Sequence, residues 1–240
     1  MKKLQITALL LIVTSIAKAE FPIDVFFKKS DLFFKSFVTD SKVDYLALNS
    51  DATLLNETLQ IAAKIDVKQL DQNTYKAFWI NTYNLLVIKG IVDNYPVKSV
   101  QDIKGFFDKK SFDVAQQRMS LKKIEETMIK KVLKDPFLNF VLVCASNGCP
   151  PLINKAYLPE TIDKQLEEQT RISINNPSFI RINNETKTIE VSEMFEWYRE
   201  DFVNNEYKVI TFLNKYRTNK IDENWSVEYY KYDWTLNSKK

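Results

Sequence analysis

The alternation of apolar and polar positions predicts three long helices in the first part of the chain. Residues 24–38 and 51–65 repeat apolar side chains about every three to four positions, the spacing of amphipathic helices. Residues 73–92 are apolar on nearly every side, so we expect a helix that is buried in the centre of the fold. Pro96 follows shortly after, which is a common signal beyond a helix end.

Shorter helices and dispersed strands follow along the rest of the chain. Ser120 is placed to cap a helix over residues 121–134. Further elements are predicted as a buried strand over 140–145, a hairpin of strands 178–182 and 187–191, a helix over 207–217 and a late strand over 226–232. Because no βαβ rhythm appears, we predict an α+β fold in which the central helix packs on a small mixed or antiparallel sheet.

The first nineteen residues have the pattern of a secretory signal peptide. A basic start is followed by the apolar run 4–17, and Ala17-Lys18-Ala19 supplies the small residues of a cleavage site. The run is short for a membrane span, so an N-terminal anchor is the less favoured alternative. We therefore expect an exported protein, periplasmic or extracellular, that has no integral membrane span after cleavage. Residues 20–240 carry no repeat or linker and are predicted to form a single domain.

The net charge of the chain changes when this segment is removed. The full sequence holds 34 Lys and Arg against 31 Asp and Glu, and residues 1–19 contribute three lysines and no acid. A chain that begins at Glu20 is therefore formally neutral. This charge balance gives no indication of nucleic-acid binding.

The sequence contains no histidine, which excludes several kinds of active site within this chain. A Ser-His-Asp or Cys-His nucleophile pair and a histidine-containing metal site all need an imidazole. Three glycines leave no P-loop and no dinucleotide-binding glycine motif. We therefore expect neither a metal nor a cofactor.

The two cysteines flank a turn that follows the predicted strand 140–145. Cys144 would end the strand, and Asn147-Gly148 is a turn signal before Cys149. Three interpretations remain open: a disulfide between Cys144 and Cys149, a Cys144 that is simply a small buried side chain, or a nucleophilic thiolate at Cys149. The spacing is not that of a CxxC redox site.

Several other polar side chains occupy unusual positions. Asn81 and Asn84 share one face of the predicted central helix, where holding a neighbouring loop is favoured over contacting a ligand. Tyr83 is expected in the core more readily than in a binding site. Glu125 is a candidate general base, although a solvated helix face is the default for such a carboxylate. Strand alternation explains the aromatic stretch 229–237 more simply than a glycan-binding surface.

A series of short motifs is spread over most of the chain. They are Val43-Asp44-Tyr45, Ala77 to Asn84, Tyr95-Pro96-Val97, Ser120-Leu121, Ile124-Glu125, Asp135-Pro136, Val143 to Ser146, Cys149 to Leu152, Phe195 to Tyr198, Asp201-Phe202, Tyr232-Asp233-Trp234 and Leu236-Asn237. Taken in this order, these motifs resemble the domain of unknown function 547 family. The resemblance spans about residues 43–237 and implies the fold, the Asn81/Asn84 helix and the Cys144–Cys149 turn.

The chain departs from this family pattern where imidazoles are expected. Members usually carry His after the Ile-Glu pair, where this chain has Glu126, and Arg-x-His after Asp-Pro, where it has Phe137 and Asn139. The family is similar to a thiol-enzyme-like group in which a histidine lies beside the cysteine motif. With both histidines replaced, the resemblance does not imply a Cys-His mechanism for this chain.

Three functional hypotheses follow. The first is a catalytically degenerate protein that binds a small molecule, peptide or envelope component in the ancestral cleft, with Asn81, Asn84, Tyr83 and Asn139 as candidate contacts. The second is a hydrolase or acyl-transfer enzyme that uses Cys149 or Ser146 with a carboxylate base such as Glu125. The third is a structural envelope protein, favoured if the cysteines form a disulfide and no pocket exists.

Overall fold

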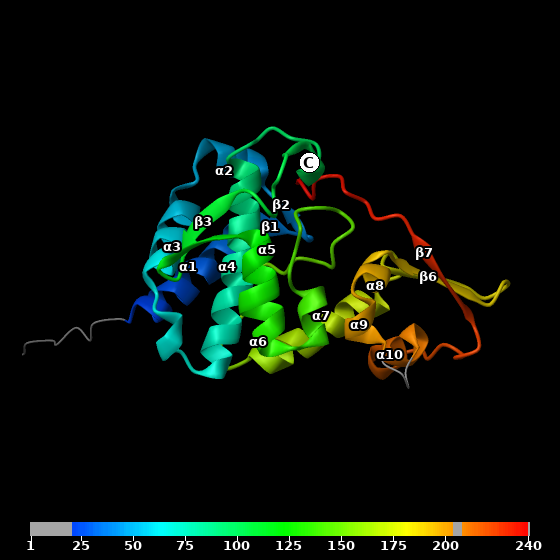
Figure 1. Cartoon of the computed structure of the whole chain (residues 1–240). Helices are drawn as coiled ribbons and strands as arrows, with labels where there is room; N and C mark the ends of the chain where they lie inside the picture. The colour runs from blue at the N-terminus through cyan, green and yellow to red at the C-terminus, as the bar shows by residue number, and fades with distance from the viewer. Residues whose placement is uncertain (1–20, 204–207, 240) are drawn as a thin grey trace, which may run out of the picture.

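The computed structural model describes residues 21–203 and 208–239. The predicted signal peptide, residues 1–19, lies outside the described residues, so it stays a prediction. Helices and short strands are mixed along the chain, and the predicted α+β class is confirmed. The buried side chains form two hydrophobic cores, a larger helical one and a smaller one around a three-stranded sheet. Figure 1 shows the helical part beside the part that contains this sheet. The single-domain assignment stays a prediction.

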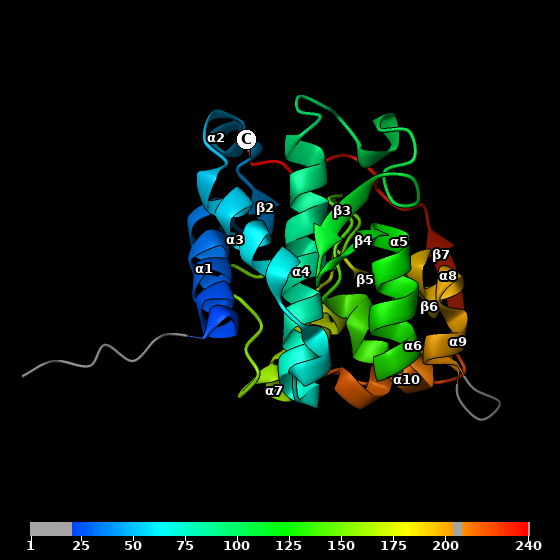
Figure 2. The same ribbon diagram turned by 60° about the vertical axis from the view of Figure 1, so that its left-hand side comes forward.

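The three long helices predicted from the apolar pattern are present. They are α1 (Pro22–Phe37), α3 (Thr53–Lys64) and α4 (Gln72–Val92), and the short α2 (Tyr45–Ser50) precedes α3. Figure 2 shows α4 standing between α1 and α3 on one side and α5 and α6 on the other. The helix therefore occupies the centre of the larger core, as its apolar character predicts.

Local capping fixes where α4 begins. The Asp71 carboxylate accepts hydrogen bonds from the backbone N–H groups of Asn73 at 3.0 Å and Thr74 at 3.1 Å. Such a cap satisfies donors that have no partner within the first turn. From Ala77 onward nearly every side chain of the helix is buried, including polar Asn81 and Asn84.

The helix predicted over residues 121–134 is present, with an irregular middle. Ser120 caps it by accepting a hydrogen bond from the Lys123 backbone N–H at 3.3 Å. Its parts are α5 (Leu121–Lys123), the π-helical η3 (Ile124–Lys130) and α6 (Lys131–Leu133). The wider turns of η3 carry Glu125. Such π-helical turns occur frequently at functional sites.

The strand predicted over residues 140–145 is wrong. Asp135 instead starts the 3-10 helix η4 (Pro136–Phe140) by accepting a hydrogen bond from the Phe137 backbone N–H at 2.9 Å. The chain beyond Phe140 is apolar but forms no strand, and its backbone bonds the Asn84 side chain of α4 at Val141 and Val143. The apolar, valine-rich composition of residues 140–145 correctly predicts that most of them are buried. Their backbone groups, however, bond a side chain of α4 and not a neighbouring strand.

The second core contains the sheet and the C-terminal helices. The predicted hairpin is confirmed as β5 (Ile180–Asn183) and β6 (Thr188–Ser192), with Ile182 opposite Ile189. The late strand is confirmed as β7 (Ser226–Tyr230), which pairs with β6 in parallel and makes the sheet mixed. The helices of this part are α7 (Ile162–Asn175), α8 (Met194–Trp197), α9 (Arg199–Phe202) and α10 (Val209–Tyr216).

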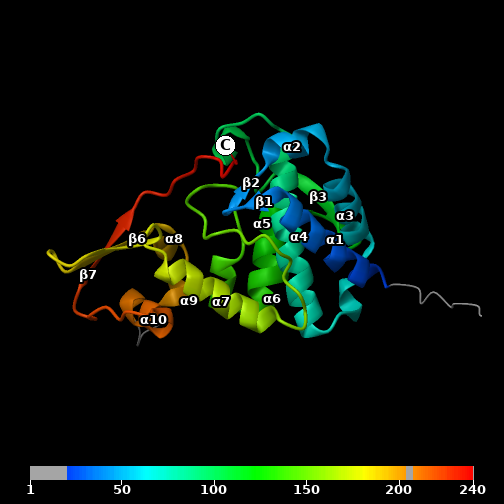
Figure 3. The ribbon, with the colours of Figure 1, turned by 180° about the vertical axis from the view of Figure 1, so that it is seen from behind.

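The central helix reaches this sheet through an intermediate layer. α4 packs mainly on the other helices, whereas α7 contacts α4 on one side and α10 and β5 on the other (Figure 3). Small hairpins and 3-10 turns complete the fold: β1 (Val38–Thr39) with β2 (Lys42–Val43), β3 (Ser111–Val114) with β4 (Gln117–Ser120), η1 (Val67–Gln69) and η2 (Val100–Asp102). Within residues 21–203 and 208–239, no helix combines the length and apolarity needed to cross a bilayer.

The C-terminal segment, residues 231–239, joins the two cores. It leaves β7 and runs back to the helical part, seen in red in Figure 1. Isolated β-bridges pair Thr235 with Ser99, Leu236 with Ser146 and Ser238 with Val43. This return places the side chains between Lys231 and Thr235 beside residues that lie far away in the sequence.

Candidate functional site

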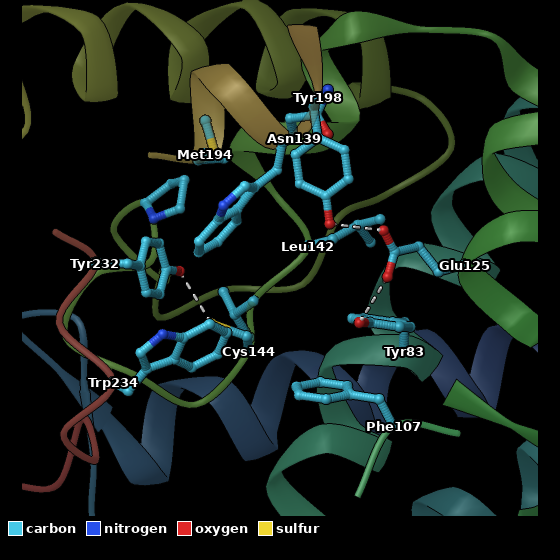
Figure 4. Close-up of a pocket in the computed structure, with 13 residues that line it drawn as sticks. Tyr83, Phe107, Glu125, Asn139, Leu142, Cys144, Met194, Tyr198, Tyr232 and Trp234 are labelled. Atoms are coloured by element: carbon cyan, nitrogen blue, oxygen red, sulfur yellow. Dashed lines mark hydrogen bonds between the residues drawn. The ribbon is translucent and has the colours of Figure 1, made fainter. Parts of the chain in front are cut away.

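A cavity of about 270 Å³ lies where the two cores meet the C-terminal segment (Figure 4). Six of its thirteen described lining residues are aromatic. The lining residues are Tyr83 of α4, Phe107, Glu125 of η3, Asn139 of η4, Leu142, Val143, Cys144, Pro150, Met194 and Trp197 of α8, Tyr198, Tyr232 and Trp234. An aromatic cavity with few polar groups is the usual form of a small-molecule site.

The Glu125 carboxylate is fixed between two tyrosines. The Tyr83 hydroxyl donates to Oε2 at 3.2 Å, and the Tyr198 hydroxyl donates to Oε1 at 3.2 Å. Figure 4 shows both hydroxyls pointing at the two carboxylate oxygens. Lys130 Nζ adds an ion pair to Oε1 at 3.2 Å. These three contacts orient the carboxylate toward the cavity.

The two tyrosines remain hydrogen-bond donors over a wide range of pH. Burial raises the pKa of Tyr83 well above its usual range, and the neighbouring Glu125 carboxylate raises it further. Burial and the same carboxylate also raise the pKa of Tyr198. Both phenols are therefore neutral near pH 7 and can keep donating to Glu125.

Three further rings form one wall of the cavity. Tyr232 and Trp234 have ring centroids 4.8 Å apart, and Trp197 lies 5.0 Å from Tyr232 and 5.8 Å from Trp234. Trp197 keeps 47% of its surface exposed, whereas Tyr232 is buried. A large aromatic side chain that is half in solvent at the edge of a cavity is suited to contact an incoming molecule.

The two cysteines form a disulfide, the first of the three interpretations left open by the sequence. Cys144 lines the cavity, and the Tyr232 hydroxyl lies 3.0 Å from its sulfur. Cys149 lies behind it, where its sulfur accepts a hydrogen bond from the Cys144 backbone N–H at 2.9 Å. In this oxidised form Cys149 has no thiol, so the predicted thiolate nucleophile is not present.

Gly148 lets the C-terminal segment approach the disulfide turn. A Cβ on Gly148 would lie 2.9 Å from the Asp233 backbone nitrogen and from the Tyr232 ring. The Gly148 backbone N–H donates to the Asp233 carbonyl at 2.8 Å, and that of Asn147 donates to the Thr235 carbonyl at 2.8 Å. This close approach places Tyr232 over the disulfide.

Comparison with known families identifies the helical side of this site. Residues 67–172 match the family model described as "Protein of unknown function, DUF547". This match assigns residues 67–172 to the DUF547 family. The comparisons with curated proteins and with solved structures give no match. The DUF547 match includes α4, η3 and the disulfide turn, whereas α8 and the C-terminal segment, which supply the tryptophans of the cavity, lie beyond it.

Asn81 and Asn84, both within the matched residues, hold loops and lie outside the cavity lining. Asn81 Nδ2 donates to the Tyr157 carbonyl at 2.7 Å, and its Oδ1 accepts from the Tyr157 backbone N–H at 2.9 Å. Asn84 bonds the Val141 carbonyl at 2.8 Å and the Val143 backbone N–H at 3.0 Å in the same way. The alternative in which these amides fix a neighbouring loop is therefore the arrangement observed, in place of the predicted ligand contacts.

Ser146 and Asn139 have different surroundings. Ser146 is buried and lies outside the lining, with its hydroxyl 3.0 Å from the Cys144 sulfur. Asn139, which occupies a position where a DUF547 histidine is expected, does line the cavity. Its Nδ2 donates to Asp201 at 2.8 Å and to the Pro136 carbonyl at 3.3 Å. Of the predicted site residues, the structure thus gathers Tyr83, Glu125, Asn139 and Cys144.

From the sequence, no site role is assigned to the tryptophan wall, although its residues fall in stretches that carry the family resemblance. Tyr232 and Trp234 belong to the aromatic stretch assigned to strand alternation, but β7 ends at Tyr230 and both rings lie beyond it. An aromatic run that continues past a predicted strand is the signal that was available. In the described ranges, no group of three or more Cys, Asp or Glu side chains is arranged to hold a metal ion.

The buried tyrosines give the protein an alkaline limit of stability. Burial raises the pKa of Tyr45, Tyr157 and Tyr232 as well as that of the two tyrosines beside Glu125. Tyrosines of the unfolded chain ionise at about pH 10, whereas the buried tyrosines of the folded protein stay protonated there. The free energy of unfolding therefore keeps the full contribution of these groups below about pH 10 and falls as the pH rises above it.

Tyr157→Phe should reduce this loss. Urea unfolding between about pH 10 and about pH 11.5 should show a shallower fall for the variant, by up to about 1.4 kcal/mol per pH unit, because one titrating group is removed. Equal slopes for both proteins over this range would contradict the assignment of Tyr157 to that loss.

Proposed function

We propose that this DUF547 member binds a small organic molecule in the aromatic cavity and does not use thiol catalysis. The observation that carries the proposal is the combination of aromatic walls with one fixed carboxylate, Glu125, in a cavity whose lining includes the half-exposed Trp197. Aromatic surface provides affinity, and a single oriented polar group provides selectivity.

The size of the cavity limits the ligand. At about 270 Å³, the cavity lies near the lower end of the range of small-molecule sites, which is about 300 to 1,000 Å³, so it suits a small ligand. A charged groove adjoins it and shares Phe107, Glu125, Trp197 and Tyr198 with it. A larger ligand can therefore place its remaining atoms in the groove.

Two features support binding over the other hypotheses. The hydrolase hypothesis needs a nucleophile that faces the cavity, but Cys149 is bonded to Cys144, and Ser146 is buried behind the lining. The hypothesis of a structural envelope protein required a disulfide and the absence of a pocket. The protein has both the disulfide and a pocket, so only one of the two conditions is met. We also propose that the protein works in an oxidising compartment, because a disulfide and the export-type pattern of residues 1–19 agree.

The proposal is tested with a neutral aromatic probe, naphthalene-2-methanol, by saturation-transfer NMR. We expect binding to the full chain and at least about a tenfold loss of affinity in Leu142→Trp, because the larger side chain fills the cavity. Trp225→Phe is the matched control, since Trp225 lies in the second core outside the cavity lining.

A second variant covers the case in which Leu142→Trp does not fold. Trp197→Ala removes a wall residue that is 47% exposed, so the core should tolerate it. We expect weaker probe binding in Trp197→Ala than in Trp225→Phe. Absence of probe binding to the unmodified chain, or equal binding by all variants, would overturn the proposed function.

A further inference from the structure

We propose that the cavity selects an organic cation, namely an ammonium group on a short apolar stem. This inference rests on the proposed function, because it assigns a ligand class to the same cavity. It follows from three features of the site: the faces of the aromatic wall, the orientation of Glu125, and the charge of the adjoining groove.

The aromatic wall brings together rings of the kind that attract cations. Trp197, Tyr232 and Trp234 lie within 5.8 Å of one another by ring centroid, and Tyr83 and Tyr198 lie opposite Tyr232 and Trp234 (Figure 4). Aromatic faces carry the negative part of the ring quadrupole, and tryptophan attracts cations most strongly. A group of such rings around one cavity is a known form of ammonium recognition.

Glu125 gives the cavity its charge. Among the thirteen described lining residues, it is the one acidic side chain, and none is Lys or Arg. An ionised carboxylate offers about four acceptor positions. Tyr83, Tyr198 and Lys130 use three of them. The carboxylate can therefore accept one more donor, or face a quaternary ammonium without losing its present contacts.

Lys130 already makes the kind of contact that we assign to the ligand. Its ammonium lies 3.3 Å from the centroid of the Tyr198 ring and 3.2 Å from the Glu125 carboxylate. It reaches both from the groove and is not part of the cavity lining. On the groove side, the Tyr198 ring and the Glu125 carboxylate thus hold the ammonium group of Lys130. On the cavity side, the same carboxylate lies among further aromatic rings.

The adjoining groove favours the approach of a cation. Its lining carries five carboxylates against three cationic side chains: Glu125, Glu126, Glu196, Glu200 and Asp201 against Lys122, Lys130 and Arg199. Lys130 also lies 3.8 Å from Asp201, so it is engaged with two acids. A cleft with excess negative charge concentrates cations and repels anions.

The test uses three probes that share a phenyl ring and have nearly the same shape: phenyltrimethylammonium, its uncharged isostere tert-butylbenzene, and the anion benzenesulfonate. Dissociation constants are measured by ligand-observed NMR. We expect the cation to bind about tenfold more tightly than the uncharged isostere, and the anion to bind most weakly.

Variants assign this preference to the site. Glu125→Gln should bring the affinity for the cation close to that for tert-butylbenzene and leave the latter nearly unchanged, which also shows that the variant is folded. Glu168→Gln removes the same charge from an exposed position on α7 and should keep the preference. Trp197→Ala should reduce the preference for the cation several-fold. Because the Trp197 ring is half exposed, this variant is expected to fold and replaces Glu125→Gln as the test if that variant does not fold.

Each remaining outcome counts against the inference. Equal affinity for the cation and its uncharged isostere, or tighter binding of benzenesulfonate, would overturn cation selection while leaving a binding cavity in place. A preference that survives Glu125→Gln and Trp197→Ala would place the cation site elsewhere. If naphthalene-2-methanol does not bind to the unmodified chain, the proposed function fails, and this inference fails with it.

Discussion

Asn84→Ala is expected to lower the free energy of unfolding by about 3 to 5 kcal/mol. The Asn84 amide satisfies the Val141 carbonyl at 2.8 Å and the Val143 backbone N–H at 3.0 Å, and both contacts are buried. Its removal leaves two backbone groups without these partners, and each costs about 1 to 3 kcal/mol when buried. The space left by the side chain adds to the loss.

Urea denaturation followed by circular dichroism measures this effect. Asn73→Ala is the matched control, because Asn73 lies on the same helix but is exposed in its first turn. We expect its stability to change by less than about 0.5 kcal/mol. A loss below about 1 kcal/mol for Asn84→Ala would mean that the loop over residues 141–145 does not depend on this amide.

Phe140→Ala is expected to cost about 3 to 5 kcal/mol through the second core. The Phe140 ring is fully buried, and its centroid lies 5.8 Å from that of Phe202 and 6.1 Å from that of Phe195. It also stacks on Phe212 at 6.3 Å with an angle of 4° between the planes. Removing the ring opens a void among three others, which close packing cannot easily refill.

Near-UV circular dichroism and urea unfolding test this expectation together. Phe137→Ala is the control, because Phe137 belongs to the same 3-10 helix but is only partly buried and packs on Tyr216. Its cost should be at most about half as large. If the two variants lost equal stability, the second core would not be centred on Phe140.

The helical core was predictable because its signals are local. The apolar pattern of residues 73–92 and the cap at Ser120 each depend on neighbours within a few turns, and both predicted helices are present. The hairpin of β5 and β6 was predictable for the same reason, since its strands are joined by a short turn. Local pattern and local capping therefore account for most of the elements.

Contacts between distant segments account for what was missed. Residues 140–145 have the composition of a strand, but Asn84, more than fifty positions earlier, takes the place of a strand partner. The helices α8, α9 and α10 lie between β6 and β7 in the chain, so the parallel pairing of these strands is likewise a contact between distant segments. Sequence patterns do not encode which side chain will meet a given backbone segment.

The site was predictable in part. Tyr83, Glu125, Asn139 and Cys144 were marked by unusual positions or by the family resemblance, and they do line one cavity. The tryptophan wall requires the C-terminal segment to return across the molecule, and no local pattern predicts that return. Asn81 was marked because it is polar within an apolar helix, and that signal is shared by residues that hold loops and residues that bind ligands.

The most direct test of the account uses the four tryptophans of the chain as reporters. The protein is labelled with 5-fluorotryptophan, its ¹⁹F resonances are assigned by single Trp→Phe variants, and naphthalene-2-methanol is added. We expect the resonances of Trp197 and Trp234 to shift, because both rings line the cavity, and those of Trp79 and Trp225 to stay in place. A spectrum in which Trp197 and Trp234 do not respond, or in which Trp225 responds instead, would contradict ligand binding in this cavity.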